Sequence, residues 1–246
     1  MSYVIVTPYF RESPELLRRC IDSVAAQTVA TEHILVADGV PQDWIDETNV
    51  RHLRLDRNYA DFGDTPRAVG ALLAVSGGAA GFGFLDGDNW LEPGHIAACL
   101  DTARRAGAEN GGVDYVISRR ALCRPDGSRL PVDDESSDVH VDTNCFFLLP
   151  GSFHLVAHFG LIPRPLAPIC DRVFYDMLRQ RGLRSAETAT VTVNYHCLWS
   201  VIYESVGETP PPGAKPNPPW AEINEWSAGL SPAEHTAVRK LCGLEP

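Results

Sequence analysis

The amino-acid sequence predicts an α/β protein with a mostly parallel sheet flanked by helices. Short apolar runs such as 3–6 and 33–37 alternate with segments whose apolar residues recur at helical spacing, and this alternation is typical of βα units. Three of the runs end at polar or acidic residues, Thr7, Asp38 and Asp86. Because ligands of parallel sheets gather at the carboxyl ends of the strands, a binding site is expected there.

Composition and charge limit the size of the protein and its partners. The chain has 246 residues, of which 44% are hydrophobic, so it can bury one sizeable core. The formal net charge of -11 argues against a nucleic-acid partner, because proteins that bind a phosphate backbone normally present a basic face. Any phosphate group bound here is therefore expected to bring a cation.

Targeting and cysteine signals are absent from the sequence. No basic-then-apolar leader opens it, and no apolar run approaches the roughly 18 to 20 residues that span a bilayer. The seven cysteines are an odd number without a C-x-x-C pair, which favours reduced, structural thiols over a disulfide framework or a zinc site. We therefore expect a cytoplasmic protein without a transmembrane segment.

Strand and helix signals follow one another along the chain. Strands are expected at 3–6, 33–37, 50–55, 82–88, 115–118, 144–149 and 188–193. Helices are expected at about 14–25, 66–76, 93–106, 152–158, 171–181 and 232–241. Ser13 and Thr65 are the expected N-caps of the first two helices, because each precedes a proline that can occupy the first helical position, and Gly107 is expected to stop the third helix.

Two segments lie outside this pattern. The polar stretch 119–141, with Asp126-Gly127 as an expected hairpin turn, is long enough to be a binding loop or a mobile lid. Residues 209–219 carry six prolines, which indicates an extended tail before the last helix.

The run 82–90 suggests a metal site. Residues i and i+2 of an extended segment project to the same side, so Asp86 and Asp88 can converge on one cation, with Gly87 allowing the backbone to turn between them. Oxygen ligands suit Mg²⁺ or Mn²⁺. The alternative is that Asp-Gly is simply a good turn dipeptide after a strand.

Four other residues have both a structural and a functional interpretation. Asp38 is either a turn residue or a ligand residue at a strand end. Arg67, in a first helical turn where the dipole favours anions, is either a solvated side chain or a phosphate ligand. Asp171 is either the N-cap of its helix or a reactive carboxylate. His196, at the end of a strand, is either a structural residue or a metal or phosphate contact.

Several motifs together resemble family 2 glycosyltransferases of the GT-A fold, over roughly residues 3–204. The segments that carry the resemblance are 4–9 (VIVTPY), 20–28 (CIDSVAAQT), 35–39 (LVADG) and 84–89 (FLDGDN), the last of which is similar to the family's Asp-x-Asp motif. Residues 171–182 resemble the family helix that begins with a catalytic Asp and ends in Gly. Thr7-Pro8 reverses the commoner order, and Phe10, Ala37 and Cys170 also depart from the usual pattern.

The resemblance implies roles for individual residues. It places Thr7, Pro8 and Asp38 around a nucleotide base, Arg67 near a diphosphate, Asp86 near the ribose and metal, and Asp88 on the metal. Tyr9, Glu12 and Gly87 join the expected nucleotide-sugar site, and His196 is a further metal candidate. The catalytic base would be Asp171. Acceptor specificity is expected from 119–141 and from Asn144, Tyr195 and Trp199.

These roles imply an inverting, metal-dependent transfer of a sugar from a nucleotide-diphosphate sugar, most simply a UDP-sugar, to an acceptor hydroxyl, which could belong to a saccharide. Residues 1–205 would form the GT-A domain, with a nucleotide-sugar half at 1–118 and an acceptor half at 119–205, and 206–246 would be the Pro-rich tail with its short helix. The alternatives are a non-catalytic carbohydrate- or partner-binding module on the same fold and a sugar-phosphate nucleotidyltransferase. The latter usually has a Gly-rich basic loop after its first strand, where this chain has Thr7 to Glu12 without glycine.

Overall fold

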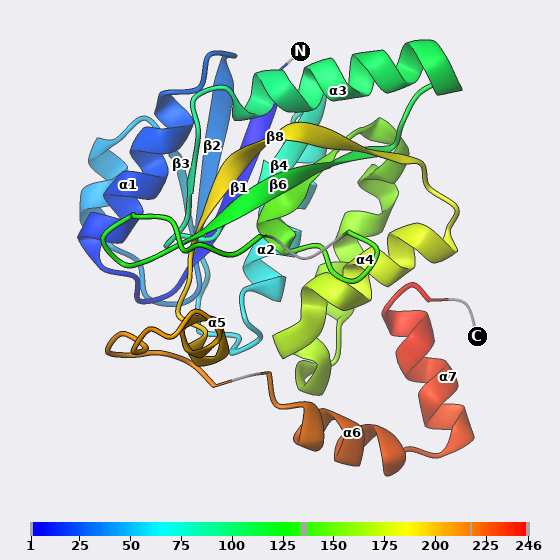
Figure 1. Ribbon diagram of the computed structural model, residues 1–246. Coiled ribbons are helices and arrows are strands. Elements are labelled where there is room, and N and C mark those ends of the chain that lie inside the picture. The colour runs from blue at the N-terminus through cyan, green and yellow to red at the C-terminus, as the bar shows by residue number, and fades with distance from the viewer. Residues whose placement is uncertain (1, 134–136, 217, 245–246) are drawn as a thin grey trace.

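A computed structural model describes residues 2–133, 137–216 and 218–244 of the chain (Figure 1). The described strands form one curled eight-stranded sheet in the order β3-β2-β1-β4-β7-β6-β8-β5. All are parallel to one another except β7 and β5, which run antiparallel to their neighbours. The predicted α/β class with a mostly parallel sheet is confirmed. The strands are β1 Tyr3–Tyr9, β2 Thr31–Ala37, β3 Arg51–Arg54, β4 Gly81–Phe84, β5 Trp90–Leu91, β6 Tyr115–Cys123, β7 Phe146–Leu148 and β8 Ser185–His196.

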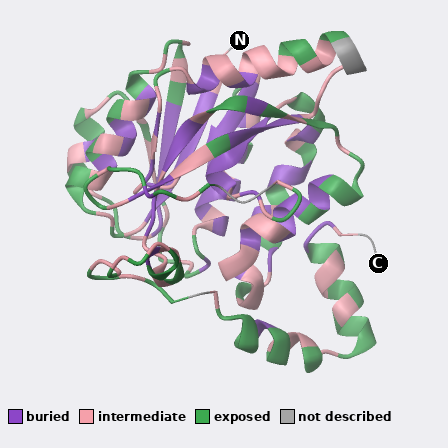
Figure 2. Ribbon diagram, viewed as in Figure 1, coloured by how far each residue is buried: buried purple, intermediate pink, exposed green. Residues whose placement is uncertain are grey.

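Helices cover both faces of the sheet. On β1, Thr7 faces Cys20 of α1, whereas Val6 lies against Gly70 of α2, so these two helices pack on opposite sides. Buried residues concentrate in the strands between them, as Figure 2 shows in purple. The helices are α1 Pro14–Ala25, α2 Asp64–Ser76, α3 His95–Asn110, α4 Cys170–Gln180, α5 Ser200–Ser205, α6 Trp220–Ala228 and α7 Pro232–Leu241, with 3₁₀ segments at Asp43–Glu47, Thr143–Cys145, Pro150–Leu161 and Arg164–Ile169.

Strand β1 runs further than the sequence predicts. It was expected to end before Thr7-Pro8, yet it pairs with β2 as far as Tyr9. Pairing with β4 stops at Val6, and the Tyr9 carbonyl oxygen accepts from Asp38 on the β2 side, so Pro8 faces the side where β4 has already ended. The missing N–H of Pro8 therefore costs no ladder hydrogen bond.

The start of α2 and the end of α3 also differ from expectation. Thr65 is not an N-cap: α2 begins at Asp64 after Gly63, whose φ of 89° places it in the left-handed region. The Thr65 hydroxyl instead donates to Asp61 at 2.5 Å. Helix α3 continues past Gly107 to Asn110 and stops at Gly111, where a φ of 76° ends the helix.

Part of the stretch expected to be a loop is strand. Strand β6 continues to Cys123 because it pairs with β8 along most of its length. The expected turn at Asp126-Gly127 is confirmed, with Gly127 at φ 87° and Cys123 bridged to Arg129. The expected binding loop therefore reduces to the residues beyond this hairpin, of which 134–136 lie outside the described residues.

The C-terminal region folds back onto the body. Helix α6 was not expected, whereas α7 was, and its N-terminus has a capping box formed by Ser231 and Glu234. Cys242, after α7, is 1% exposed and belongs to the main core. The Leu241 carbonyl oxygen lies 2.9 Å from His158 Nδ1, in the long 3₁₀ segment.

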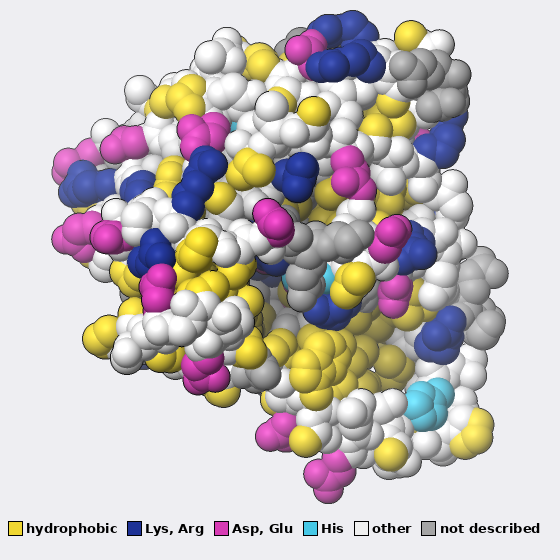
Figure 3. All heavy atoms as spheres, in the orientation of Figure 1, with side chains coloured by type: hydrophobic (Ala, Val, Ile, Leu, Met, Phe, Trp, Pro, Cys, Tyr) yellow, Lys and Arg dark blue, Asp and Glu magenta, His cyan; other side chains and the backbone are white. Residues whose placement is uncertain are grey.

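The surface carries charges of both signs. Figure 3 shows acidic and basic side chains interspersed over the face that carries β6 and β8. In the part of the chain that the structure describes, no helix is long and apolar enough to cross a bilayer.

Candidate active site

The carboxyl ends of β2 and β4 deliver Asp38 and Asp86 to one edge of the sheet, and α2 begins beside them. Its first turn places Arg67 with Nη2 2.6 Å from Asp86 Oδ1. Arg67 is 4% exposed. Burial alone disfavours the guanidinium charge, but Asp86 and the other acidic neighbours raise the pKa of Arg67 above its ordinary value. Of the two interpretations of Arg67, the solvated surface residue is therefore wrong.

Asp86 is held from its other side by Asn144. The Asn144 side-chain amide donates to Asp86 Oδ2 at 3.1 Å, and the Asp86 backbone N–H donates to Asn144 Oδ1 at 2.6 Å. Asn144 also donates to Asp142, which pairs with Arg120 at 2.6 Å. Asp86 is therefore fixed in one orientation by a polar chain that runs along the edge of the sheet.

A second group of buried polar residues surrounds Arg67. Nη1 lies 3.3 Å from Asp64 Oδ1 and 3.9 Å from the Cys170 sulfur, at the start of α4. Burial raises the pKa of Asp64 to about 8, and burial together with Asp64 raises the pKa of the Cys170 thiol. Cys170 therefore stays a neutral thiol and cannot act as a base.

Asp88 and His196 form the part of the site suited to a cation. Among the described residues, both ring nitrogens of the buried His196 lack a hydrogen-bond partner. His196 Nδ1 lies 3.8 Å from Asp88 Oδ2. A carboxylate and an imidazole side by side are ligand types that can coordinate a divalent ion.

No cluster of three or more His, Cys, Asp or Glu that could hold a metal alone exists among the described residues.

Glu12 and Gly87 flank this group. Glu12 accepts a hydrogen bond from the Phe10 backbone at 2.7 Å, and burial, together with Asp88 and Asp86, raises its pKa. The turn expected at Gly87 is present, because the Asn89 N–H donates to the Asp86 carbonyl oxygen at 3.0 Å, but β4 ends at Phe84, so Asp86 and Asp88 do not lie on one extended segment. The φ of Gly87 is not positive. A Cβ there would lie 2.9 Å from the Leu17 side chain, so close packing against α1 is the reason for glycine.

Asp171 lies in the first turn of α4, one residue after Cys170. The residue before the helix is Ile169, so Asp171 is not the N-cap. Its Oδ1 accepts from the Arg172 backbone N–H at 2.7 Å, and its Oδ2 lies 2.6 Å from His140 Nε2. Because Cys170 contacts Arg67, the first turn of α4 lies at the same edge of the sheet as Arg67.

The N-terminal candidates lie deeper than the sequence suggests. The Thr7 hydroxyl is fully buried, 2.8 Å from His33 Nε2, and Tyr9 is 2% exposed with its hydroxyl 2.7 Å from His52 Nε2. Pro8 lies beside Gly63. The side chains of Thr7 and Tyr9 therefore support the strand edge and do not face a ligand.

Asp38 is buried beneath the loop 56–63. Its Oδ1 accepts from the Tyr59 backbone N–H at 2.9 Å, and burial raises its pKa. Asp38 therefore ties the loop to the end of β2, next to the α2 N-terminus.

The candidates on the acceptor side are only partly brought together. Asn144 belongs to the polar chain on Asp86, and Tyr195 lies under the Arg120 guanidinium, with 5.0 Å from Cζ to the ring centroid. Trp199 donates to the Tyr195 hydroxyl at 3.0 Å. Trp199 is therefore one contact further from Asp86 than Tyr195 is.

Three members of the site were not primary candidates in the sequence, although His140 lies in the polar stretch 119–141 and Asp142 is an alternative candidate for the base. His140 contacts Asp171, Asp142 contacts Asn144, and Asp64 contacts Arg67. His140 and Asp142 both belong to the end of the polar segment after β6, where a lone His followed by Asp was the available signal. Asp64 gave none, because an Asp in a first helical turn is common on surfaces.

The fold and the site define a class: an α/β protein of the GT-A type with acidic residues and a buried arginine at the carboxyl edge of its sheet. A model of the family described as glycosyl transferase family 2 matches residues 4–161. The chain belongs to this family.

Solved structures of similar fold include S. aureus TarS. The structure of TarS 1-349 has a TM-score of 0.59 and 15% identity, and the match covers 80% of this chain and 60% of that one. Complexes of TarS 1-349 with UDP and with UDP-GlcNAc each give a TM-score of 0.58 at 14% identity; both cover 98% of this chain, and respectively 70% and 65% of theirs. The chain thus spans less than two thirds of the first of these structures. No curated protein sequence matches it.

Proposed function

We propose that this protein is an inverting, metal-dependent glycosyltransferase that moves a sugar from a nucleotide-diphosphate sugar, a UDP-sugar, to an acceptor hydroxyl. One observation carries the proposal: Asp86 is fixed between Arg67 and Asn144, Asp88 with its neighbour His196 follows two residues later, and Arg67 also contacts Cys170, the residue before Asp171. Membership of glycosyl transferase family 2 and the nucleotide complexes of TarS support the donor class.

The leaving diphosphate needs positive charge that an acidic protein cannot supply from its surface. Arg67 is the cation at the N-terminus of α2, where backbone N–H groups also favour anions. Asp88 and His196, with Asp86 beside them, would hold Mn²⁺ or Mg²⁺. The ion would supply Lewis-acid stabilisation of the charge that develops on the diphosphate.

Asp171 is the proposed general base. An acceptor hydroxyl is a poor nucleophile at neutral pH, so its proton must be removed as the new bond forms. The proton moves to a carboxylate oxygen of Asp171 while the acceptor oxygen bonds to the anomeric carbon and the diphosphate leaves from the opposite face. This single displacement inverts the anomeric configuration.

His140 positions the base. A carboxylate only accepts hydrogen bonds, so His140 Nε2–H donates to Asp171 Oδ2, while Arg172 N–H holds the other oxygen. The plane of the carboxylate is thereby fixed, and lone pairs remain on both oxygens for the acceptor proton.

Asp38 is proposed to recognise the base of the nucleotide, because a carboxylate accepts a hydrogen bond from the uracil ring N–H, which cytosine lacks. Pro8 and the loop above Asp38 would form the walls of the pocket for the nucleotide base. In this proposal the half 1–118 binds the donor, and the half 119–205 supplies the catalytic base and binds the acceptor.

Calorimetry with UDP, CDP and GDP tests the donor site. We expect UDP to bind most tightly, and we expect EDTA to weaken binding strongly, because Asp86 and Asp88 otherwise face the diphosphate as like charges. If UDP bound as tightly with EDTA as without it, the proposed role of the divalent cation would be contradicted. Equal binding of the three nucleotides would remove Asp38 from base recognition.

Release of UDP from UDP-GlcNAc and related donors distinguishes an enzyme from a non-catalytic binding module.

A further inference from the structure

Helix α6 places an exposed tryptophan beside the residues that hold the catalytic base. Trp220 is the first residue of α6 and 41% exposed, and the Arg172 guanidinium lies over its ring, with 5.6 Å from Cζ to the centroid. Arg172 directly follows Asp171 in the first turn of α4. The ring therefore packs on the residue that directly follows Asp171.

Arg172 makes a second contact, with the segment that bears His140. Arg172 Nη1 donates to the Val139 carbonyl oxygen at 3.4 Å, and Val139 precedes His140, the residue hydrogen-bonded to Asp171. Val139 is 64% exposed. Figure 3 shows apolar side chains gathered between α4 and the start of α6, at the border of a hollow in the surface.

The position of α6 is set by packing. Ile223 is 5% exposed and anchors the helix to the body. The stretch after α5 is not the extended tail that the sequence predicts, because it turns at Gly213, with φ 81°, and the Lys215 N–H donates to the Leu198 carbonyl oxygen at 2.6 Å. An exposed tryptophan on an anchored helix is a preorganised contact surface.

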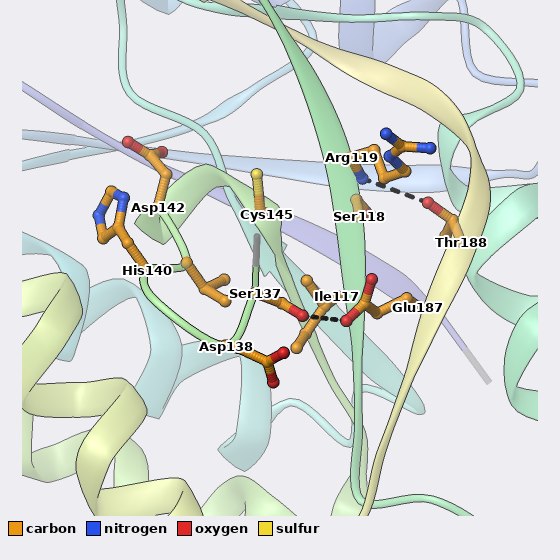
Figure 4. A pocket seen from close by; sticks show the side chains of 11 residues that line it. Ile117, Ser118, Arg119, Ser137, Asp138, His140, Asp142, Cys145, Glu187 and Thr188 are labelled. Atoms are coloured by element: carbon orange, nitrogen blue, oxygen red, sulfur yellow. Dashed lines mark hydrogen bonds between the residues drawn. The ribbon is translucent and has the colours of Figure 1, made fainter. Parts of the chain in front are cut away.

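A polar cavity of about 360 Å³ lies beside the segment that bears His140, and His140 belongs to its lining. Figure 4 shows the His140 ring directed away from Glu187 and Thr188 on the β8 wall. Among the described residues that line this cavity none is Phe, Tyr or Trp, whereas the approach to Asp171 over Arg172 offers the exposed Trp220 ring. A flat apolar surface beside Asp171 is therefore supplied by Trp220 and not by the cavity.

We propose that Trp220 is the acceptor-binding platform and that the acceptor is a saccharide whose pyranose ring stacks on the indole. A sugar ring has an apolar C–H face that suits an aromatic surface and hydroxyls that suit the polar groups around it, here Arg172, His140 and Asp171. This inference rests on the proposed function. It also gives a role to α4 and α6, which both lie beyond the residues 4–161 that match the family.

Acceptor kinetics test the platform. The probes are methyl β-D-glucopyranoside, methyl N-acetyl-β-D-glucosaminide and their β-linked disaccharides, assayed with the UDP-sugar that the wild type uses. We expect Trp220→Ala to raise the KM for the saccharide about 10-fold or more and Trp220→Phe to raise it less, because an aromatic ring is retained. The Kd for UDP should stay at the wild-type value in both.

Trp226→Phe, six residues further along α6, is the matched control and should leave the saccharide KM unchanged. A Trp220→Ala variant that keeps the wild-type melting temperature and the wild-type saccharide KM would overturn the platform. If Trp220→Ala lowers the melting temperature strongly, Arg172→Gln replaces it: loss of the guanidinium over the ring should raise the saccharide KM, and an unchanged KM would overturn the platform. Transfer to a peptide or lipid hydroxyl but to no saccharide would also overturn it. A wild type that neither binds UDP nor releases it from any UDP-sugar would instead contradict the proposed function itself.

Discussion

At the scale of single residues, the site depends on a few buried polar contacts that fix functional groups in place. Asp86 is held by Arg67 and Asn144, and Asp171 by His140 and a backbone N–H. Such contacts are effective because the groups are largely removed from water, where competing hydrogen bonds would otherwise let the side chains rotate.

Asp171→Asn separates catalysis from structure. The side-chain oxygen of Asn can still accept from the Arg172 N–H, so the melting temperature and the Kd for UDP should stay near wild type. Transfer should fall about 10²- to 10⁴-fold, because an amide has no basicity. Transfer at the wild-type rate would refute the assignment and move the search for the base to Asp142, Asp176 or His196.

His140→Ala should lower kcat about 10-fold through loss of the hydrogen bond that orients Asp171, with the KM for the UDP-sugar little changed. His140→Gln retains a side-chain N–H donor and should recover part of that loss. Equal rates for the Ala and Gln variants, measured at saturating donor, would show that the hydrogen bond is not what matters at this position.

At the scale of elements, the ends of strands and the first turns of helices do most of the positioning. Strand β2 ends at Ala37, Asp38 follows it, and Gly39 then turns with φ 76° so that the loop 56–63 can pack against it. A Cβ on Gly39 would lie 2.2 Å from the Asn58 backbone nitrogen. The loop that leads to Arg67 is therefore placed by direct backbone contact.

Gly39→Ala should destabilise the fold and weaken UDP binding together. The control is Gly78→Ala, which has a similar φ of 80° but nothing within 4 Å of the added Cβ. Both variants pay a conformational cost of about 1 kcal/mol, and only Gly39→Ala must also displace the loop. Denaturant unfolding measures the difference. Equal losses in the two variants would mean that the loop is not packed against Gly39.

At the scale of the whole molecule, two buried histidines tie stability to pH. Burial lowers the pKa of His33 to about 3 and that of His95 to about 4. His95 Nδ1 lies 2.9 Å from the Thr192 hydroxyl, and His33 bonds Thr7, so each ring is held neutral inside the sheet packing.

Mildly acidic pH should therefore destabilise the protein. Below about 6.5 the unfolded chain protonates these histidines while the folded protein does not, so stability is complete above that value and falls as the pH drops towards about 4. Each histidine contributes up to about 1.4 kcal/mol per pH unit. His95→Gln should reduce the loss of melting temperature between pH 7 and pH 5, whereas His154→Gln, at an exposed position, should not. The same loss in His95→Gln as in wild type would contradict this account.

The sequence by itself determined the α/β class, the parallel strands and the position of Asp38 and Asp86 after strands whose carboxyl ends share one edge of the sheet. Strand and helix signals are local, and a parallel sheet brings the carboxyl ends of its strands together whatever lies between them. The sequence also indicated the helix at 232–241 through its Ser-Pro start.

Only the tertiary structure decided which polar side chains face the site and which support it from inside. Thr7 and Tyr9 precede a loop as candidate ligands do, yet the packing of β1 against α1 turns their side chains inward. His140, Asp142 and Trp220 are far from Asp86 and Asp171 in sequence, and the chain must close long loops to bring them together. Such contacts depend on the packing of whole elements, and no local pattern of residues encodes them.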